Sequence, residues 1–134
     1  MKTVLFVCVE NSCRSQMAEA FAKMLGAGVI DAYSSGSRPS GKVNEKAIAS
    51  MKEVGYDLSS HRSKALADIP PIEYDVVVTM GCGDECPVVR AKQRLEWNIP
   101  DPKQMDMKQF SEIRDRIRAK VVHLIESCSR ERIG

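Results

Sequence analysis

Short apolar runs alternate along the chain with longer segments in which apolar residues recur every three or four positions. The apolar runs are typical of buried strands, and they fall at residues 3–7, 29–34, 74–80 and 94–99. The helical spacing predicts amphipathic helices at residues 16–25, 45–54 and 107–127. The expected N-caps of the first two helices are Ser15 and Asn44.

Strands that alternate with helices predict an α/β fold with a parallel sheet and helices on both of its faces. No repeat, linker or low-complexity segment divides the chain, so residues 1–134 are expected to form one domain. Ligands of such folds bind at the carboxyl ends of the strands. Cys8 follows the first expected strand, Cys82 the third and Asp101 the fourth, so we expect them to meet at one edge of the sheet.

The charge and the cysteine count narrow the function classes. The formal net charge is +2 and the basic residues are interspersed with acidic ones, which argues against nucleic acid or a membrane as the main partner. The apolar start is too short to cross a bilayer and lacks the features of a secretory signal, so we expect a cytoplasmic protein. Five cysteines, an odd number, do not suit a disulfide framework, and in a reducing compartment they are more often catalytic, metal-binding or buried.

Cys8 and Arg14 are separated by five residues between an expected strand and an expected helix. Backbone N–H groups in such a loop can cradle an oxyanion above a thiol, and a guanidinium binds two of its oxygens. A helix N-terminus and a nearby cation lower a cysteine pKa from about 8.5 to roughly 3.5–7.5, and the Cys8 position offers both. The expected oxyanion-binding residues are Val9, Glu10, Asn11, Ser12, Cys13, Arg14 and Ser15.

The competing interpretation makes Cys8 a buried strand-end cysteine and Arg14 a surface residue, and the combined pattern disfavours it. Asp101 stands between two prolines that fix its backbone, which suits a general acid aimed into a site. The same composition is typical of an ordinary turn, so spacing alone leaves both interpretations of Asp101 open.

The run from Cys8 to Glu19 resembles the anion loop of the low-molecular-weight tyrosine phosphatase fold, and more closely that of its arsenate reductase branch. The resemblance continues through further segments, namely Tyr33-Ser34-Ser35-Gly36, Met51-Lys52-Glu53-Val54-Gly55, Cys82-Gly83-Asp84, Cys86-Pro87 and Trp97 with Asp101-Pro102. It implies a three-layer α/β fold with a four-stranded parallel sheet flanked by helices. It also implies Cys8 as nucleophile, Arg14 as oxyanion clamp and Asp101 as proton donor.

Arsenate reduction requires two electrons, so it needs thiols besides that of Cys8. Cys82 and Cys86 are the candidates: Cys82 attacks the Cys8 sulfur, arsenite leaves, and Cys86 moves the disulfide to Cys82–Cys86. Gly81 and Gly83 are expected hinges for this exchange. Thioredoxin is the expected electron donor and glutaredoxin the alternative. We expect a monomer that binds arsenate, with phosphate or sulfate as analogues, and that uses no metal or other cofactor.

The alternative function is a phosphatase that hydrolyses phosphate monoesters through a cysteinyl phosphate, and weak hydrolysis is expected in either case. Few aromatic residues are available to stack on a phenyl ring, which favours a small inorganic anion. A non-enzymatic oxyanion-binding regulator is disfavoured by the combination of Cys8, Arg14 and Asp101. A zinc site at Cys82 and Cys86 lacks two further ligands at a suitable spacing.

Some members of the resembled family bind potassium beside the loop. Asn11, Glu19 and Ser34 match that site, but the usual aspartate is replaced around Lys64. The Lys64 ammonium can substitute for the cation, so we predict activity that does not depend on potassium. Cys13 is expected either to be a small buried residue or to protect Cys8 through a reversible disulfide.

Overall fold

The chain alternates strands and helices as its apolar pattern predicts. The computed structural model describes residues 1–81 and 89–133. The regular elements are β1 (Lys2–Cys8), α1 (Arg14–Leu25), β2 (Ile30–Gly36), α2 (Glu45–Lys52), β3 (Tyr74–Thr79), β4 (Ala91–Glu96) and α3 (Met107–Ile133), with short 3-10 helices η1 (Leu58–Ser60) and η2 (Leu66–Asp68).

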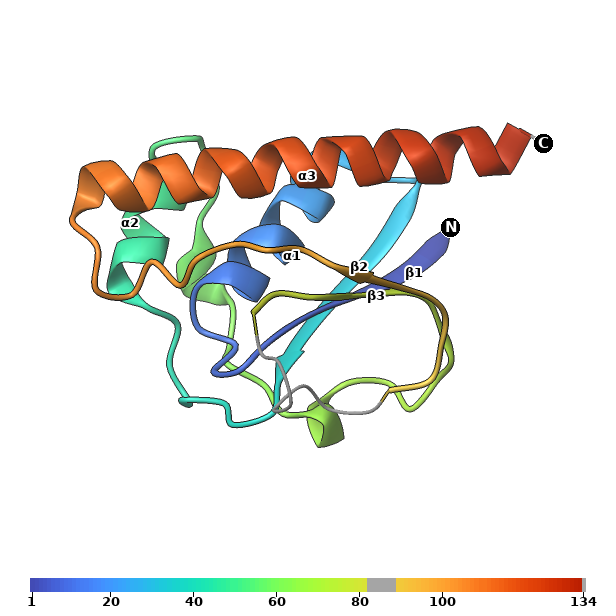
Figure 1. Ribbon diagram of the computed structural model, residues 1–134, viewed down its shortest axis with the longest axis horizontal. Coiled ribbons are helices and arrows are strands. Elements are labelled where there is room, and N and C mark those ends of the chain that lie inside the picture. Colours follow the sequence, from blue (N-terminus) through green and yellow to red (C-terminus); the bar gives the residue numbers. More distant parts are fainter. Residues whose placement is uncertain (82–88, 134) are drawn as a thin grey trace.

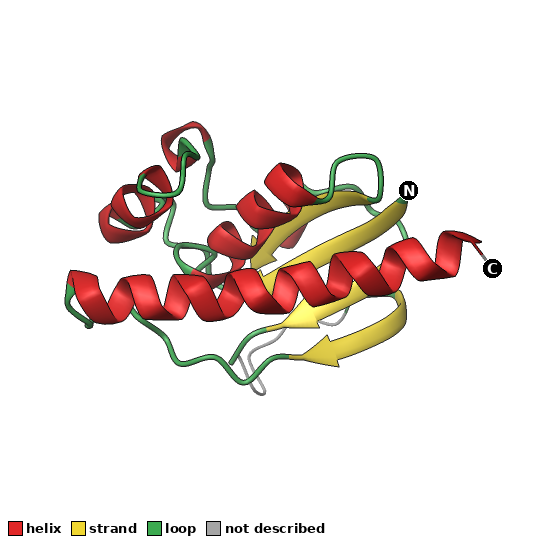
Figure 2. Cartoon of the chain, turned by 90° about the horizontal axis from the view of Figure 1, so that it is seen from above, coloured by secondary structure: helices red, strands yellow, loops and turns green. Residues whose placement is uncertain are grey.

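The four strands form one parallel sheet in the order β2-β1-β3-β4. Val4 of β1 is in register with Ala32 of β2 and with Val76 of β3, and Val76 pairs with Gln93 of β4. The strands run in one direction, so the chain leaves β1, β3 and β4 at the same edge of the sheet (Figure 2). The predicted four-stranded parallel sheet flanked by helices is therefore confirmed.

Alternate residues of β1 enter two different cores. Val4 and Phe6 face the side of the sheet that carries α1 and α3, with α2 beside them, and they belong to the larger core (Figure 1). Leu5 and Val7 face the other side, where a smaller core is covered by η2 and the chain next to it. Because β1 is buried on both faces, the loop that follows it starts from a fixed point.

Several element boundaries differ from the sequence prediction by a few residues, including the end of α3 at Ile133 instead of residue 127, and two of the differences have a clear local reason. Ser15 is not the N-cap of α1: Cys13 holds that position, and Ser15 lies inside the first turn, where its hydroxyl contacts Cys8 and Asn11. Strand β4 begins at Ala91 instead of residue 94, because it is an edge strand with a largely exposed, polar sequence that the apolar pattern does not detect. By contrast, the predicted N-cap Asn44 is confirmed: its Oδ1 accepts hydrogen bonds from the backbone N–H groups at the start of α2.

Candidate active site

Residues 8–15, called the anion loop below, connect β1 to α1. Asn11 has a φ of 49°, a left-handed conformation that asparagine adopts more readily than most residues. Gly36 at the end of β2 makes room for the turn, because a Cβ there would lie 2.5 Å from the carbonyl oxygen of Val9 and 2.9 Å from the backbone nitrogen of Asn11. The sequence around Gly36 carries no signal of this role, since the contact joins two segments far apart in the chain.

The side chain of Asn11 is fully buried and fixes the anion loop from inside. Its Nδ2 donates to Ser15 Oγ at 2.7 Å, while its Oδ1 accepts from the Lys64 backbone N–H at 2.7 Å and from Gln16 Nε2 at 2.9 Å. A fully bonded buried network of this kind holds one geometry, because any rearrangement leaves a buried polar group unpaired.

Cys8 is buried at the end of β1, and its sulfur lies 2.9 Å from Ser15 Oγ. Since Asn11 Nδ2 already donates to Ser15 Oγ, the Ser15 hydroxyl hydrogen is free to point at the sulfur. The Ser15 hydroxyl is therefore placed to donate a hydrogen bond to the Cys8 sulfur.

Arg14, the first residue of α1, is almost entirely buried. Its NH1 group donates to the carbonyl oxygen of Ile99 at 3.0 Å, and its NH2 group lies 3.9 Å from Asp101 Oδ2. One end of the guanidinium is thus anchored to the chain beyond β4, and within residues 1–81 and 89–133 no other hydrogen bond engages its remaining N–H groups, which can bind an oxyanion.

Asp101 lies in the loop of residues 97–106 that joins β4 to α3, called the Asp101 loop below. Its side chain is about half exposed, and its Oδ1 accepts a hydrogen bond from the Lys103 backbone N–H at 3.0 Å. A cavity of about 20 Å³ lies between the two loops, lined by Cys8, Val9, Glu10, Ser12, Cys13, Arg14 and Asp101. The structure thus brings Cys8 and Asp101 together, as their positions after two strands predict, and Arg14 at the start of α1 lies beside them.

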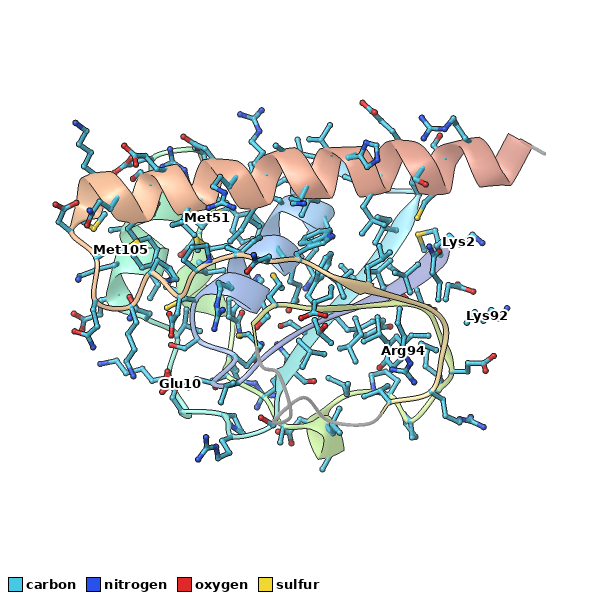
Figure 3. All side chains as sticks on the ribbon, in the orientation of Figure 1. Lys2, Glu10, Met51, Lys92, Arg94 and Met105 are labelled. Carbon is cyan, nitrogen blue, oxygen red and sulfur yellow. The ribbon has the colours of Figure 1, made fainter. Side chains whose placement is uncertain are left out.

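An exposed ion pair joins the two loops at the rim of this cavity. Lys103 Nζ lies 3.0 Å and 3.1 Å from the two carboxylate oxygens of Glu10 (Figure 3 labels Glu10 at the turn after β1). These hydrogen bonds raise the pKa of Lys103. The pair borders a wider hollow of about 500 Å³ between the anion loop and the start of α2.

Cys13 is buried in the anion loop, and burial, followed by the charges of Asp101 and Cys8, raises its pKa to about 12. The Cys13 thiol is therefore protonated near neutral pH and cannot serve as the nucleophile. This geometry agrees with the interpretation of Cys13 as a small buried residue.

Lys64 places its ammonium group beside the anion loop. Its Nζ lies 3.4 Å from Glu19 Oε1, 3.3 Å from Ser34 Oγ and 3.1 Å from the carbonyl oxygen of Arg62. Burial opposes the ionisation of Glu19, but Lys64 and Lys23 hold its pKa below the usual value. The Lys64 ammonium thus lies beside Glu19 and Ser34, two of the residues that match the potassium site of related proteins.

Cys82 and Cys86 lie outside the described residues, but Gly81, which precedes Cys82, is described and lies against Arg14. In the described part of the chain, no group of three or more His, Cys, Asp or Glu side chains is arranged to hold a metal ion. Within the same residues, no helix is long and apolar enough to cross a membrane.

Residues 3–133 match the sequence profile of the low molecular weight phosphotyrosine protein phosphatases. The chain therefore belongs to this family.

Within the family, the chain is similar to proteins named as arsenate reductases. It is 42% identical to the glutaredoxin arsenate reductase of Synechocystis sp. over 132 residues, which cover 96% of this chain and 100% of that protein. A solved structure of an arsenate reductase in the phosphate binding state is 40% identical, with a TM-score of 0.84 over 96% of this chain and 99% of that one. The thioredoxin-dependent arsenate reductase of Corynebacterium glutamicum is 28% identical, with a TM-score of 0.79 over 98% of this chain and 63% of that one.

Proposed function

We propose that this protein is an arsenate reductase that uses Cys8 as its nucleophile. The observation that carries the proposal is the small cavity that Cys8, Arg14 and Asp101 share, in a chain similar over nearly its whole length to named arsenate reductases. The cavity places the Arg14 guanidinium beside the Cys8 thiol, a combination that suits the oxygens of a small inorganic anion.

In the first step, the Cys8 thiolate attacks arsenic(V), an S–As bond forms and an As–O bond breaks. Asp101 gives its proton to the departing oxygen, which leaves as water. The N–H groups of the anion loop and the guanidinium of Arg14 hold the remaining oxygens, and these donors are in place before the substrate arrives. Because NH1 of Arg14 is bonded to the carbonyl oxygen of Ile99, the other N–H groups of the guanidinium bind the substrate oxygens.

In the second step, the electrons come from a second thiol. Cys82 attacks the Cys8 sulfur, and the S–As bond breaks with its electron pair passing to arsenic. Arsenite is released, and a Cys8–Cys82 disulfide remains on the protein. Cys86 then attacks Cys82 and releases the Cys8 thiolate. The position of Gly81, the last described residue before Cys82 in the sequence, against Arg14 supports this route.

A dithiol protein must reduce the final Cys82–Cys86 disulfide, and we propose thioredoxin for this role. One relative is named as thioredoxin-dependent and another as a glutaredoxin arsenate reductase, so turnover should be measured with each donor. We further propose that residues 1–134 act as one monomeric domain in the cytoplasm. Gel filtration tests the monomeric state, and cell fractionation tests the localisation.

Hydrolysis of phosphate monoesters is the second candidate function, because it uses the same nucleophile, clamp and acid. Among the described residues that line the cavity and the hollow beside it, none is aromatic, so an aryl phosphate finds no ring to stack on. We therefore expect only weak hydrolysis of aryl phosphates.

The test compares wild type, Cys82→Ser and Cys86→Ser in arsenate reduction with a donor and in aryl phosphate hydrolysis. Both serine variants should lose steady-state turnover of arsenate and keep hydrolysis, since hydrolysis needs no thiol besides that of Cys8. Cys128→Ala, near the C-terminal end of α3, is the control for the loss of a cysteine and should keep both activities. If Cys82→Ser and Cys86→Ser still reduce arsenate at the wild-type rate, the proposed route is wrong.

A further inference from the structure

Gly81 lies where the chain leaves β3, two residues after Thr79, and its backbone packs on the guanidinium of Arg14. A Cβ at this position would lie under 3.0 Å from Arg14 NH1, 3.4 Å from its Cζ and 3.6 Å from the carbonyl oxygen of Ile99. The same NH1 group donates to that carbonyl oxygen at 3.0 Å. Bare backbone after β3 and a carbonyl after β4 thus form a slot for one end of the guanidinium.

The conformation of Gly81 alone does not distinguish it from other glycines. Its φ is 71°, while Gly28, Gly41 and Gly55 have φ values of 82°, 82° and 89°. At these three positions an added Cβ would meet no atom within 4 Å, whereas at Gly81 it would collide with Arg14. An alanine therefore brings similar backbone strain at all four positions, but it displaces the guanidinium only at position 81.

We propose that Gly81 is a positioning residue for Arg14. It leaves open the slot that sets where the guanidinium meets a bound oxyanion. The inference rests on the proposed role of Arg14 as oxyanion clamp. Because a guanidinium at the end of a flexible side chain can move at little cost to folding, a methyl group at position 81 should displace it and leave the fold intact. Displacement of the guanidinium should therefore lower the affinity for an anion and not the stability of the fold.

The proposal predicts that the effect of a methyl group at position 81 depends on the atoms of Arg14. A lysine at position 14 has no atom equivalent to NH1, so Gly81→Ala should matter little in an Arg14→Lys background. A general disturbance of the chain after β3 would instead weaken binding equally in both backgrounds.

The experiment measures the dissociation constant of inorganic phosphate by calorimetry for wild type, Gly81→Ala, Arg14→Lys and the double variant. Phosphate binding requires neither Cys82 nor an electron donor, so the result does not depend on the redox route. Gly81→Ala should weaken phosphate binding about tenfold or more, the loss expected when hydrogen bonds to a charged group are misplaced. In the Arg14→Lys background, the same change should alter affinity less than about twofold, the resolution of such a cycle.

Gly55→Ala is the matched control, because it has a similar positive φ and no neighbour for the new Cβ. It should lose as much thermal stability as Gly81→Ala and bind phosphate like wild type. Wild-type affinity in Gly81→Ala, or an equal loss in both backgrounds, would overturn the proposal and leave the clamp role of Arg14 standing. Wild-type affinity in Arg14→Lys would overturn the clamp role itself, and the inference with it.

Discussion

The anion loop and the Asp101 loop line the same cavity, but they are held in different ways. In the anion loop, Asn11 and Ser15 are fully buried and bonded to one another, so the loop has one available geometry. In the Asp101 loop, the side chain of Asp101 is about half exposed: its Oδ1 accepts one backbone N–H within that loop, and its Oδ2 lies 3.9 Å from Arg14 NH2. One wall is therefore built for a fixed oxyanion, and the other presents an acid that water can reach.

This difference suggests a division of labour. Oxyanion binding benefits from donors that are fixed before the ligand arrives, because no free energy is then lost in reorganising them. A general acid must exchange its proton with solvent after each turnover, which requires exposure. Changes in the anion loop should therefore affect binding and stability, and changes at Asp101 should affect the chemical step.

The largest expected effect is that of Asp101→Asn, which keeps the shape of the side chain and removes its proton. Arsenate turnover should fall about 100- to 10,000-fold, the usual contribution of a general acid. Phosphate affinity should be unchanged or slightly higher, because a carboxylate beside the anion is lost. Rapid-quench kinetics and calorimetry measure the two quantities. A parallel loss of phosphate affinity and turnover would show that the two walls are not separate in function.

The second effect is that of Asn11→Ala, which leaves several buried groups of the anion loop without partners. The free energy of unfolding should fall by about 2–4 kcal/mol, with a loss of phosphate affinity. Asn11→Gly is the control, since it relieves the strain of the φ of 49° without restoring the hydrogen bonds. Urea unfolding should place the glycine variant between alanine and wild type. Wild-type stability in both variants would contradict the account of a rigid loop.

The third effect concerns Lys64, whose ammonium stands beside the anion loop. Potassium should not change the activity of the wild type, as predicted from sequence, because a cation already contacts Glu19 and Ser34. A clear rise in turnover on replacing sodium with potassium would contradict this.

The same contact makes stability depend on pH. The pKa of Glu19 is below its usual 4.5 in the folded chain, so its contribution to stability is complete above that pH and is lost as the pH falls through the folded value. Lys64→Met should raise the pKa of Glu19, lower stability at pH 7 and weaken this acid-dependent loss. Urea unfolding between pH 3 and pH 7 measures both changes. An unchanged pH profile would show that Lys64 does not stabilise the Glu19 carboxylate.

The smallest effect is that of Lys103→Gln, which breaks the exposed ion pair with Glu10. Phosphate affinity should fall about two- to threefold, because surface pairs contribute little and the Glu10 carboxylate is left facing the anion. The double variant Glu10→Gln with Lys103→Gln should recover the wild-type value. Lys92→Gln, which breaks the pair of an exposed lysine with Asp75 at the opposite edge of the sheet, is the control and should have no effect.

The sequence alone predicted the features that depend on residues close together in the chain. The spacing of Cys8 and Arg14 predicted the anion loop, and the polar side chain of Asn44 predicted a helix start. The features that it missed depend on contacts between distant segments. The space that Gly36 leaves for Val9 and the slot that Gly81 and Ile99 form for Arg14 are examples. Such contacts appear only when the strands are assembled, because no local pattern records which backbone will approach which side chain.

The central claim is that electrons reach arsenic from cysteines of this chain through the Cys8 sulfur. The most direct test is a single turnover of Cys86→Ser with arsenate and no electron donor, followed by peptide mass spectrometry and arsenite determination. The account predicts one arsenite per protein and a trapped Cys8–Cys82 disulfide. Arsenite formed while Cys8 and Cys82 remain unlinked would contradict it.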